Sequence, residues 1–148
     1  DLLCRSLAEI LPVAEELGVL VAVEPVTYHS MNSPAAVRHI LDTLRSPNMK
    51  VIFDMSNLVD AGSVAHQAAI WDQVGELWGD QIVAVHFKGQ SFKPDGSLLS
   101  TSLEESRTDY AGAFAMLRQL PQAVLPVLRE EAVPARAASD IAFMKGYF

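Results

Sequence analysis

Apolar residues recur along the chain in two alternating patterns, one typical of helices and one typical of buried strands. In residues 2–17 the apolar side chains fall at intervals of three and four, which predicts an amphipathic helix that Gly18 is placed to end. The next segment, VLVAVEPV at 19–26, is a nearly continuous apolar run, typical of a parallel strand covered on both faces. A polar loop follows, and Ser33-Pro34 then predicts the start of a second helix, over 34–45.

This cycle of strand and helix repeats to the end of the chain. We expect three further strands, at 49–57, 81–89 and 123–132, and three further helices, at 63–78, 109–120 and 135–147. A long polar loop is expected at 90–108. Strands that alternate with helices predict an α/β fold with a parallel sheet and right-handed crossovers. No linker or low-complexity segment interrupts the pattern, so we expect one domain over 1–148.

Each predicted strand ends on a side chain that can bind a metal ion or move a proton. These residues are Glu24, Asp54, His86 and Glu130, with Glu131 directly after the last. In an α/β barrel the carboxyl ends of all strands face one mouth, where active sites lie, so the four side chains are expected to converge. Taken singly, a carboxylate at a strand end is often a helix N-cap, and a histidine often has a structural role. Their repetition in successive units favours a site of three carboxylates and one imidazole, which suits one divalent ion of Mn, Mg, Co or Zn.

Four segments, VAVEPV, VIFDMSNL, IVAVHFKG and LPVLREEA, resemble the second half of the xylose isomerase-like sugar isomerases and epimerases. MNSPAAVRHIL and Asp109-Tyr110 also resemble helix starts of this family, and the similarity spans essentially the whole chain. The resemblance implies a (β/α)8 TIM barrel. A closed barrel has eight strands and typically ~250 residues, so this chain would supply about four consecutive βα units, the C-terminal half. We therefore expect a domain that is incomplete at its N-terminus, with pairing in a homo-oligomer as the alternative.

The resemblance also implies the roles of the strand-end residues. Glu24, Asp54, His86 and Glu130 would bind the metal ion, and Glu24 and Glu130 would be the catalytic pair that moves a proton through an enediolate. For the last ligand, Glu130 fits the family's spacing better than its neighbour Glu131.

Three further residues are candidates for substrate binding. Asn57 stands at a family position that often carries His or Asn, with the N-cap of the following helix as its alternative role. Lys88 lies two residues after His86, so it shares that residue's inward face, and we expect it to reach a substrate oxygen or carboxylate. The family often has Asp where this chain has Gly89, which is a departure from the pattern. His29 lies in the loop after the first strand, where a solvent-exposed loop residue is the alternative.

Composition and charge limit the choice of function. The chain is 50% hydrophobic and 20% charged, an ordinary globular balance. Eleven Lys and Arg against 18 Asp and Glu give a net charge of −7 without a basic patch, so we expect no nucleic-acid binding. The apolar runs are shorter than the ~20 residues of a membrane span, so no membrane partner is expected. The lone Cys4 favours a reducing compartment, and we expect a cytoplasmic protein. No signal peptide is visible, although the sequence begins at Asp1 without Met, which leaves room for a preceding segment.

The activity expected from this resemblance is a metal-dependent isomerase or epimerase of a small sugar, sugar phosphate or hydroxy-keto acid. A dehydratase of a keto-polyol uses the same enediolate chemistry and is the first alternative. An apurinic endonuclease of the same superfamily needs additional His ligands for three zinc ions, and the acidic charge opposes it. A catalytically inert half-barrel is the last alternative. The expected partner is a small-molecule sugar or keto-polyol.

Overall fold

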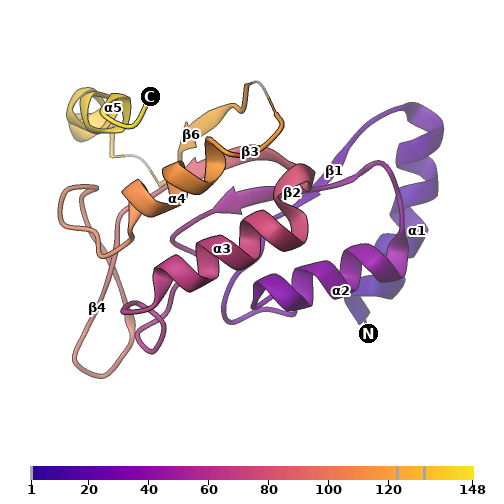
Figure 1. Ribbon diagram of the computed structural model, residues 1–148, viewed down its shortest axis with the longest axis horizontal. Coiled ribbons are helices and arrows are strands. Elements are labelled where there is room, and N and C mark those ends of the chain that lie inside the picture. The colour runs from indigo at the N-terminus through magenta and orange to yellow at the C-terminus, as the bar shows by residue number, and fades with distance from the viewer. Residues whose placement is uncertain (1, 123, 132) are drawn as a thin grey trace.

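The computed structural model describes residues 2–148 except 123 and 132 (Figure 1). Its helices are α1 (Leu2–Leu17), α2 (Pro34–Leu44), α3 (Gln67–Trp78), α4 (Tyr110–Leu117) and α5 (Ala137–Lys145). Its strands are β1 (Val21–Val23), β2 (Met49–Asp54), β3 (Ile82–Phe87), β4 (Gln90–Phe92), β5 (Leu98–Ser100) and β6 (Val127–Arg129). Two short 3₁₀ turns lie at Gly79–Gln81 and Pro134–Arg136. None of the described helices is long and apolar enough to cross a membrane.

Four strands form one parallel sheet, in the order β1-β2-β3-β6. Helix α2 connects β1 to β2, and α3 connects β2 to β3, so neighbours in the chain are neighbours in the sheet. This arrangement confirms the predicted α/β fold with a parallel sheet. All four carboxyl ends therefore point to the same edge of the sheet.

Helices α2, α3 and α4 lie side by side over one face of the sheet (Figure 1). The β2 residues that face them, Met49, Val51 and Phe53, are buried. The Phe53 ring meets Trp71 and Trp78 of α3 edge-on, at centroid distances of 5.7 and 6.0 Å. Aromatic contacts of this geometry hold the helix layer firmly against the strands.

The opposite face of the sheet carries the residues that alternate with these. Asp54 lies opposite His86 in the β2–β3 pair, and His86 lies opposite Leu128 in the β3–β6 pair, so the three share one face. Leu128 is 57% exposed. The prediction that the strands are covered on both faces is therefore met on the helix side only.

The ends of several helices follow the predicted signals. Ser33 caps α2, because its hydroxyl accepts a hydrogen bond from the backbone N–H of Ala36 and Pro34 occupies the first turn. Asp109 caps α4 in the same way, by accepting from the N–H of Gly112. Gly18 ends α1 with φ +67°, a conformation that favours glycine.

Several predicted strands and helices were longer than those in the structure. The strand predicted over 19–26 is limited to Val21–Val23, and the helix predicted over 63–78 begins at Gln67. The strand predicted over 123–132 is limited to Val127–Arg129, and its two predicted end residues lie outside the described part of the chain.

The predicted polar loop at 90–108 contains an antiparallel hairpin of β4 and β5. Its turn has Pro94-Asp95-Gly96, with Gly96 at φ +83°, and the N–H of Lys93 donates to the carbonyl of Ser97. The hairpin projects at the lower left of Figure 1, beyond the carboxyl ends of β2 and β3. It therefore stands next to the edge of the sheet at which the predicted site lies.

Candidate metal centre

The four predicted ligands meet at the carboxyl edge of the sheet. Glu24 follows β1, Asp54 ends β2, His86 lies near the end of β3, and Glu130 follows β6. One side-chain atom from each lies within 4.8 Å of the corresponding atoms of the other three. The predicted convergence of these side chains is therefore present in the structure, although they are spread over more than two thirds of the chain.

Three of these residues carry a buried atom that makes no hydrogen bond to the described residues. These atoms are Oδ2 of Asp54, Nδ1 of His86 and Oε2 of Glu130. Buried polar atoms nearly always have a hydrogen-bond partner, so three such atoms without one in the same cluster are unusual. The His86 Nδ1 lies 2.9 Å from Oε2 of Glu24 and 3.7 Å from Oε2 of Glu130, but neither contact has hydrogen-bond geometry.

These distances are consistent with one metal ion bound between the four side chains. Two atoms that bind one ion at ~2.1 Å lie about 3 Å apart when they are at right angles, and about 4 Å apart when they are opposite. The separations of 2.9 and 3.7 Å and the limit of 4.8 Å fall in or near this range. The donor set of three carboxylates and one imidazole therefore fits a divalent ion in both chemistry and geometry.

The Asp54 side chain is held in place by backbone N–H groups of the turn that follows it. Its Oδ1 accepts hydrogen bonds from the N–H groups of Ser56 at 2.8 Å and of Asn57 at 3.1 Å. The carboxylate is fully buried, and only Oδ2 remains for an ion. A tight turn at the end of β2 thus holds one ligand oxygen toward the cluster.

Asn57 holds the Glu24 side chain in place. Its Nδ2 donates to Oε1 of Glu24, and its carbonyl accepts from the N–H of Thr27. This contact leaves Oε2 of Glu24 beside His86. Because α3 begins at Gln67, Asn57 does not cap that helix, and this alternative was wrong.

Lys88, the residue after β3, lies between the carboxylates of the cluster and Glu131. Its Nζ is 3.5 Å from Asp54, 3.4 Å from Glu130 and 3.6 Å from Glu131. Its carbonyl accepts hydrogen bonds from the Ser56 hydroxyl and from the Tyr110 hydroxyl. The first residue of α4 thus anchors the end of β3, a role that the sequence analysis missed.

The charges of the cluster are strongly coupled. Burial, together with the neighbouring carboxyl group of Glu130, raises the pKa of Asp54 to about 8, although the Lys88 ammonium opposes the shift. Burial also opposes the shift at Glu130, but contacts with Asp54, Lys88 and His86 outweigh it and lower the pKa of Glu130. The pKa of Lys88 is raised, because its three carboxylate neighbours outweigh the effect of burial. A divalent cation would supply the positive charge that this cluster lacks.

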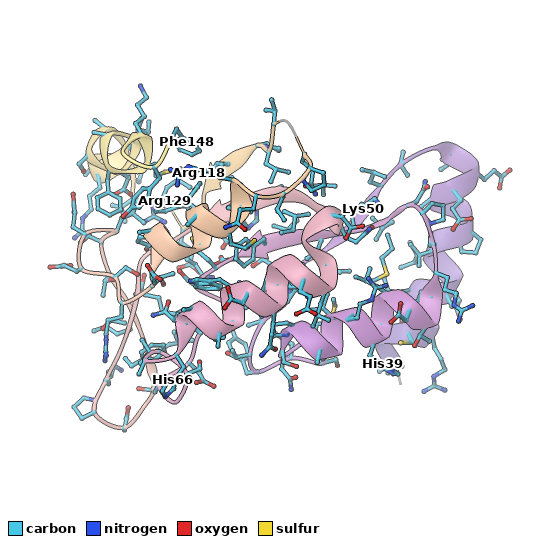
Figure 2. All side chains as sticks on the ribbon, in the orientation of Figure 1. His39, Lys50, His66, Arg118, Arg129 and Phe148 are labelled. Atoms are coloured by element: carbon cyan, nitrogen blue, oxygen red, sulfur yellow. The ribbon has the colours of Figure 1, made fainter. Side chains whose placement is uncertain are left out.

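The two acids after β6 both lie close to the Lys88 ammonium, Glu130 at 3.4 Å and Glu131 at 3.6 Å. Glu130 belongs to the metal-ligand cluster and Glu131 does not. Glu131 has φ +53°, which is rare for a residue other than glycine and ends the alternation of the strand. Arg129 pairs with the buried Asp140 of α5 at 2.8 Å, and Figure 2 shows its side chain directed toward that helix. This pair fixes the end of β6 from which both acids project.

The remaining histidines lie outside the cluster. His29 is exposed in the loop after β1, where its ring lies 4.8 Å from that of Tyr28. It lines a hollow of about 360 Å³ that it shares with Glu24, so it lies near the site without joining the ligand group. His39 lies on α2 and His66 directly before α3, and Figure 2 shows both in the helix layer.

Consecutive parallel βα units with polar side chains gathered at the carboxyl ends of the strands are typical of α/β barrels. The sequence matches the family model described as xylose isomerase-like TIM barrel over residues 1–146, and the chain therefore belongs to this family. Curated protein sequences give no match to the chain.

Solved structures show the same fold. The IOLI protein with a binding zinc atom has a TM-score of 0.73 and 19% identity, over 97% of this chain and 52% of that one. The probable 3-DHS dehydratase AsbF from Bacillus anthracis has a TM-score of 0.71 and 16% identity, over 96% of this chain and 55% of that one. The 3-keto-D-glucoside 4-epimerase YcjR from E. coli has a TM-score of 0.65 and 19% identity, over 97% of this chain and 52% of that one. The chain thus spans about half the length of these proteins and forms a half-barrel.

Proposed function

We propose that the protein is a metal-dependent isomerase or epimerase of a small sugar, sugar phosphate or hydroxy-keto acid. The observation that carries this proposal is the set of three buried atoms without a hydrogen bond on Asp54, His86 and Glu130, next to Glu24. Family membership supports it, as does the fold shared with a 3-keto-D-glucoside 4-epimerase.

The metal ion would be held by Glu24, Asp54, His86 and Glu130. When bound, a divalent ion polarises a substrate carbonyl and its neighbouring hydroxyl group, which acidifies the C–H bond between them. Mn, Mg, Co and Zn all suit this donor set, and the IOLI structure, by its own title, binds zinc.

The exposure of the four side chains supports a division of roles. Asp54 is fully buried, and the side chain of His86 is 14% exposed, so both are suited to holding the ion. The side chains of Glu24 and Glu130 are 23% and 31% exposed, so a substrate can reach them. They follow the two outer strands of the sheet order and approach the centre from different sides. One carboxylate would take the proton from carbon, and the other would return a proton to the planar enediolate.

Neighbouring side chains would keep the two acids ready for this task. The lowered pKa of Glu130 keeps it ionised at neutral pH, so it can accept a proton. Asn57 holds the Glu24 carboxylate by one oxygen, while its own Oδ1 is not used in that bond and is available to a substrate hydroxyl. Lys88 and His29 remain proposed substrate contacts, because both line hollows that border the cluster.

A dehydratase is the second candidate, because the fold is shared with the probable 3-DHS dehydratase AsbF. In that reaction one Glu would take the proton next to the carbonyl, and the other would protonate the departing hydroxyl group. An endonuclease is less well supported. The net charge is −7, and the one metal-ligand cluster found among the described residues contains a single His.

The test of the proposal combines metal binding with hydrogen exchange at the substrate carbon. The protein is loaded with Mn²⁺ and incubated in deuterated water with candidate ketoses and hydroxypyruvate. We expect Glu24→Gln and Glu130→Gln to slow the exchange by about 10²–10⁴-fold, the usual contribution of a general acid or base, while some metal remains bound. Glu104→Gln, an exposed acid outside the site, is the matched control.

His86→Ala should lose the metal and the exchange together. A parent protein that binds no divalent ion would refute the metal centre. Two Gln variants that exchange the hydrogen at the parent rate would refute the acid/base pair, even with the metal bound.

A further inference from the structure

A small hollow of about 150 Å³ lies between the end of β3 and the β4–β5 hairpin. We call it the hairpin hollow. The residues that define its chemistry are Tyr28, Asn57, Lys88, Leu98, Leu99 and Glu131. Asn57 and Lys88 also touch the candidate metal ligands, so the hollow opens directly beside the metal centre.

The hairpin that forms one wall is firmly attached. The buried Gln90 side chain donates to the carbonyls of Ser56 at 2.9 Å and Val59 at 2.8 Å, which ties β4 to the loop after β2. At Gly89 a Cβ atom would collide with the carbonyls of Thr101 and Ser102. The glycine that departs from the family pattern therefore allows this loop to cross close over the end of β3.

The charge of the hollow is unfavourable for an anion. Lys88 is the only cation that lines it among the described residues, and three carboxylates lie 3.4–3.6 Å from its Nζ. With a divalent ion in place, three positive charges would face the four carboxylates of Glu24, Asp54, Glu130 and Glu131. One negative charge remains, so a phosphate or carboxylate group would meet net repulsion here.

The hollow is also lined by accessible residues with apolar surface. Leu98 and Leu99 of β5 are 47% and 43% exposed, and Tyr28 is 69% exposed. Hollows that combine apolar residues with a few polar groups are typical of ligand sites. The apolar surface suits the C–H face of a sugar chain, whose hydroxyl groups would turn toward Asn57, Lys88 and Glu131.

We propose that the hairpin hollow receives the part of the substrate remote from the metal, and that it selects an uncharged, hydroxyl-bearing chain over a phosphorylated or carboxylated one. This inference rests on the proposed function. It narrows the substrate class of the same site to neutral ketoses or keto-polyols, with Glu131 and the hairpin leucines as the residues that determine specificity.

The test compares sugars that differ only in charge. Mn²⁺-loaded protein is titrated calorimetrically with D-xylulose and D-xylulose 5-phosphate, and with D-fructose and D-fructose 6-phosphate, and inorganic phosphate serves as the control for chelation of the ion. We expect each neutral sugar to bind at least about fivefold more tightly than its phosphate ester, the size of one charge interaction at ~4 Å in water.

Two variants assign the effect to the hollow. Glu131→Gln removes the extra negative charge, so we expect the preference for the neutral sugar to shrink about fivefold at unchanged metal content. Glu104→Gln, which removes a carboxylate outside the hollow, should leave the preference unchanged. Leu98→Ala removes part of the apolar wall and should weaken binding of the neutral sugar by about fivefold or more.

The possible results separate this inference from the proposed function. A phosphate ester that binds as tightly as its neutral sugar overturns the inference, while the metal centre stands. The same holds if Glu131→Gln leaves the preference intact, or if metal-loaded protein binds none of these sugars. A protein that fails to bind Mn²⁺, measured before any sugar is added, refutes the proposed function itself.

Discussion

Replacing Asp54 by Asn would separate the stability of the site from its metal binding. The Asp54 carboxylate is fully buried, and its Oδ1 accepts two backbone hydrogen bonds that an Asn carbonyl can also accept. The substitution puts an amide NH₂ at the position of Oδ2, and this group can donate a hydrogen bond to the neighbouring carboxylate of Glu130. The variant thus keeps the turn after β2 but removes one charge and one ligand.

The expected gain in stability follows from the pKa of Asp54, which is about 8 in the folded metal-free protein against an ordinary value of 3.8. Between these values the folded state holds a proton that the unfolded state has released, so the parent loses stability as the pH rises through this window. Each unit of pKa difference corresponds to ~1.4 kcal/mol, which gives a ceiling of about 4 kcal/mol at pH 7. The lowered pKa of Glu130 offsets part of this loss, so we expect Asp54→Asn to be more stable by about 2 kcal/mol at pH 8.

Urea unfolding of parent and variant in the presence of EDTA would measure this difference. The gain should be largest at pH 8 and should vanish near pH 4, and Asp72→Asn, at an exposed position on α3, should show no such trend. In Mn²⁺ titrations the same Asp54→Asn protein should bind at least about 100-fold more weakly, since even residues outside the ligand set contribute 10–100-fold. A variant that is less stable than the parent by the same amount at both pH values would refute the reasoning from burial.

Three further predictions concern the hairpin, the surface charge and the open sheet. Gly89→Ala should destabilise the protein by about 2 kcal/mol or more and speed amide hydrogen exchange in β4 and β5, because the added Cβ collides with the carbonyls of Thr101 and Ser102; unchanged exchange would contradict this contact. Fluorescence anisotropy should detect no micromolar binding to duplex or abasic DNA at low salt, because the net charge is −7; tight, salt-sensitive binding would favour the endonuclease alternative. In sedimentation and thermal melting the chain should self-associate or melt below the ~45–65 °C of ordinary domains, since two sheet edges lack a neighbouring strand in the described part; a monomer that melts cooperatively in that range would show that the half-barrel is self-sufficient.

The order of the strands and helices follows from local patterns, which explains why most of the fold was predictable. Runs such as VIFD and IVAVHF carry their own signal, and Ser33 and Asp109 cap helices through contacts only three residues away. The boundaries depend on partners instead. Strand β1 is short because it pairs with β2 only from Val21 to Val23, and no property of the segment 19–26 itself reveals that limit.

The hairpin was missed although its sequence contains a signal. Pro94-Asp95-Gly96 between two short segments is a recognised turn pattern, whereas the polar character of 90–108 by itself indicates only a loop. Its attachment was beyond reach, because Gln90 binds backbone carbonyls of residues 56 and 59, more than 30 positions earlier.

The candidate ligands were predictable because strand ends converge in every parallel α/β fold. The contacts that orient them were not. Asn57 reaches Glu24 across 33 positions, and Tyr110 reaches the Lys88 carbonyl across 22. The position of Glu131 depends on a left-handed backbone turn that the alternation rule for strands does not foresee.

The order of strands in the sheet bears on how the site forms during folding. The four strands of the sheet lie side by side in chain order, with the β4–β5 hairpin inserted between β3 and β6, so each candidate ligand joins the site when the next βα unit docks on the one before it. The β3–β6 pairing joins Val85 to Val127 across the longest segment of the sheet, so the entropy cost of closing the loop is highest at this step. We therefore expect the Glu24, Asp54 and His86 side chains to gather before Glu130 arrives with β6, so that a divalent ion present during refolding would accelerate the last step most.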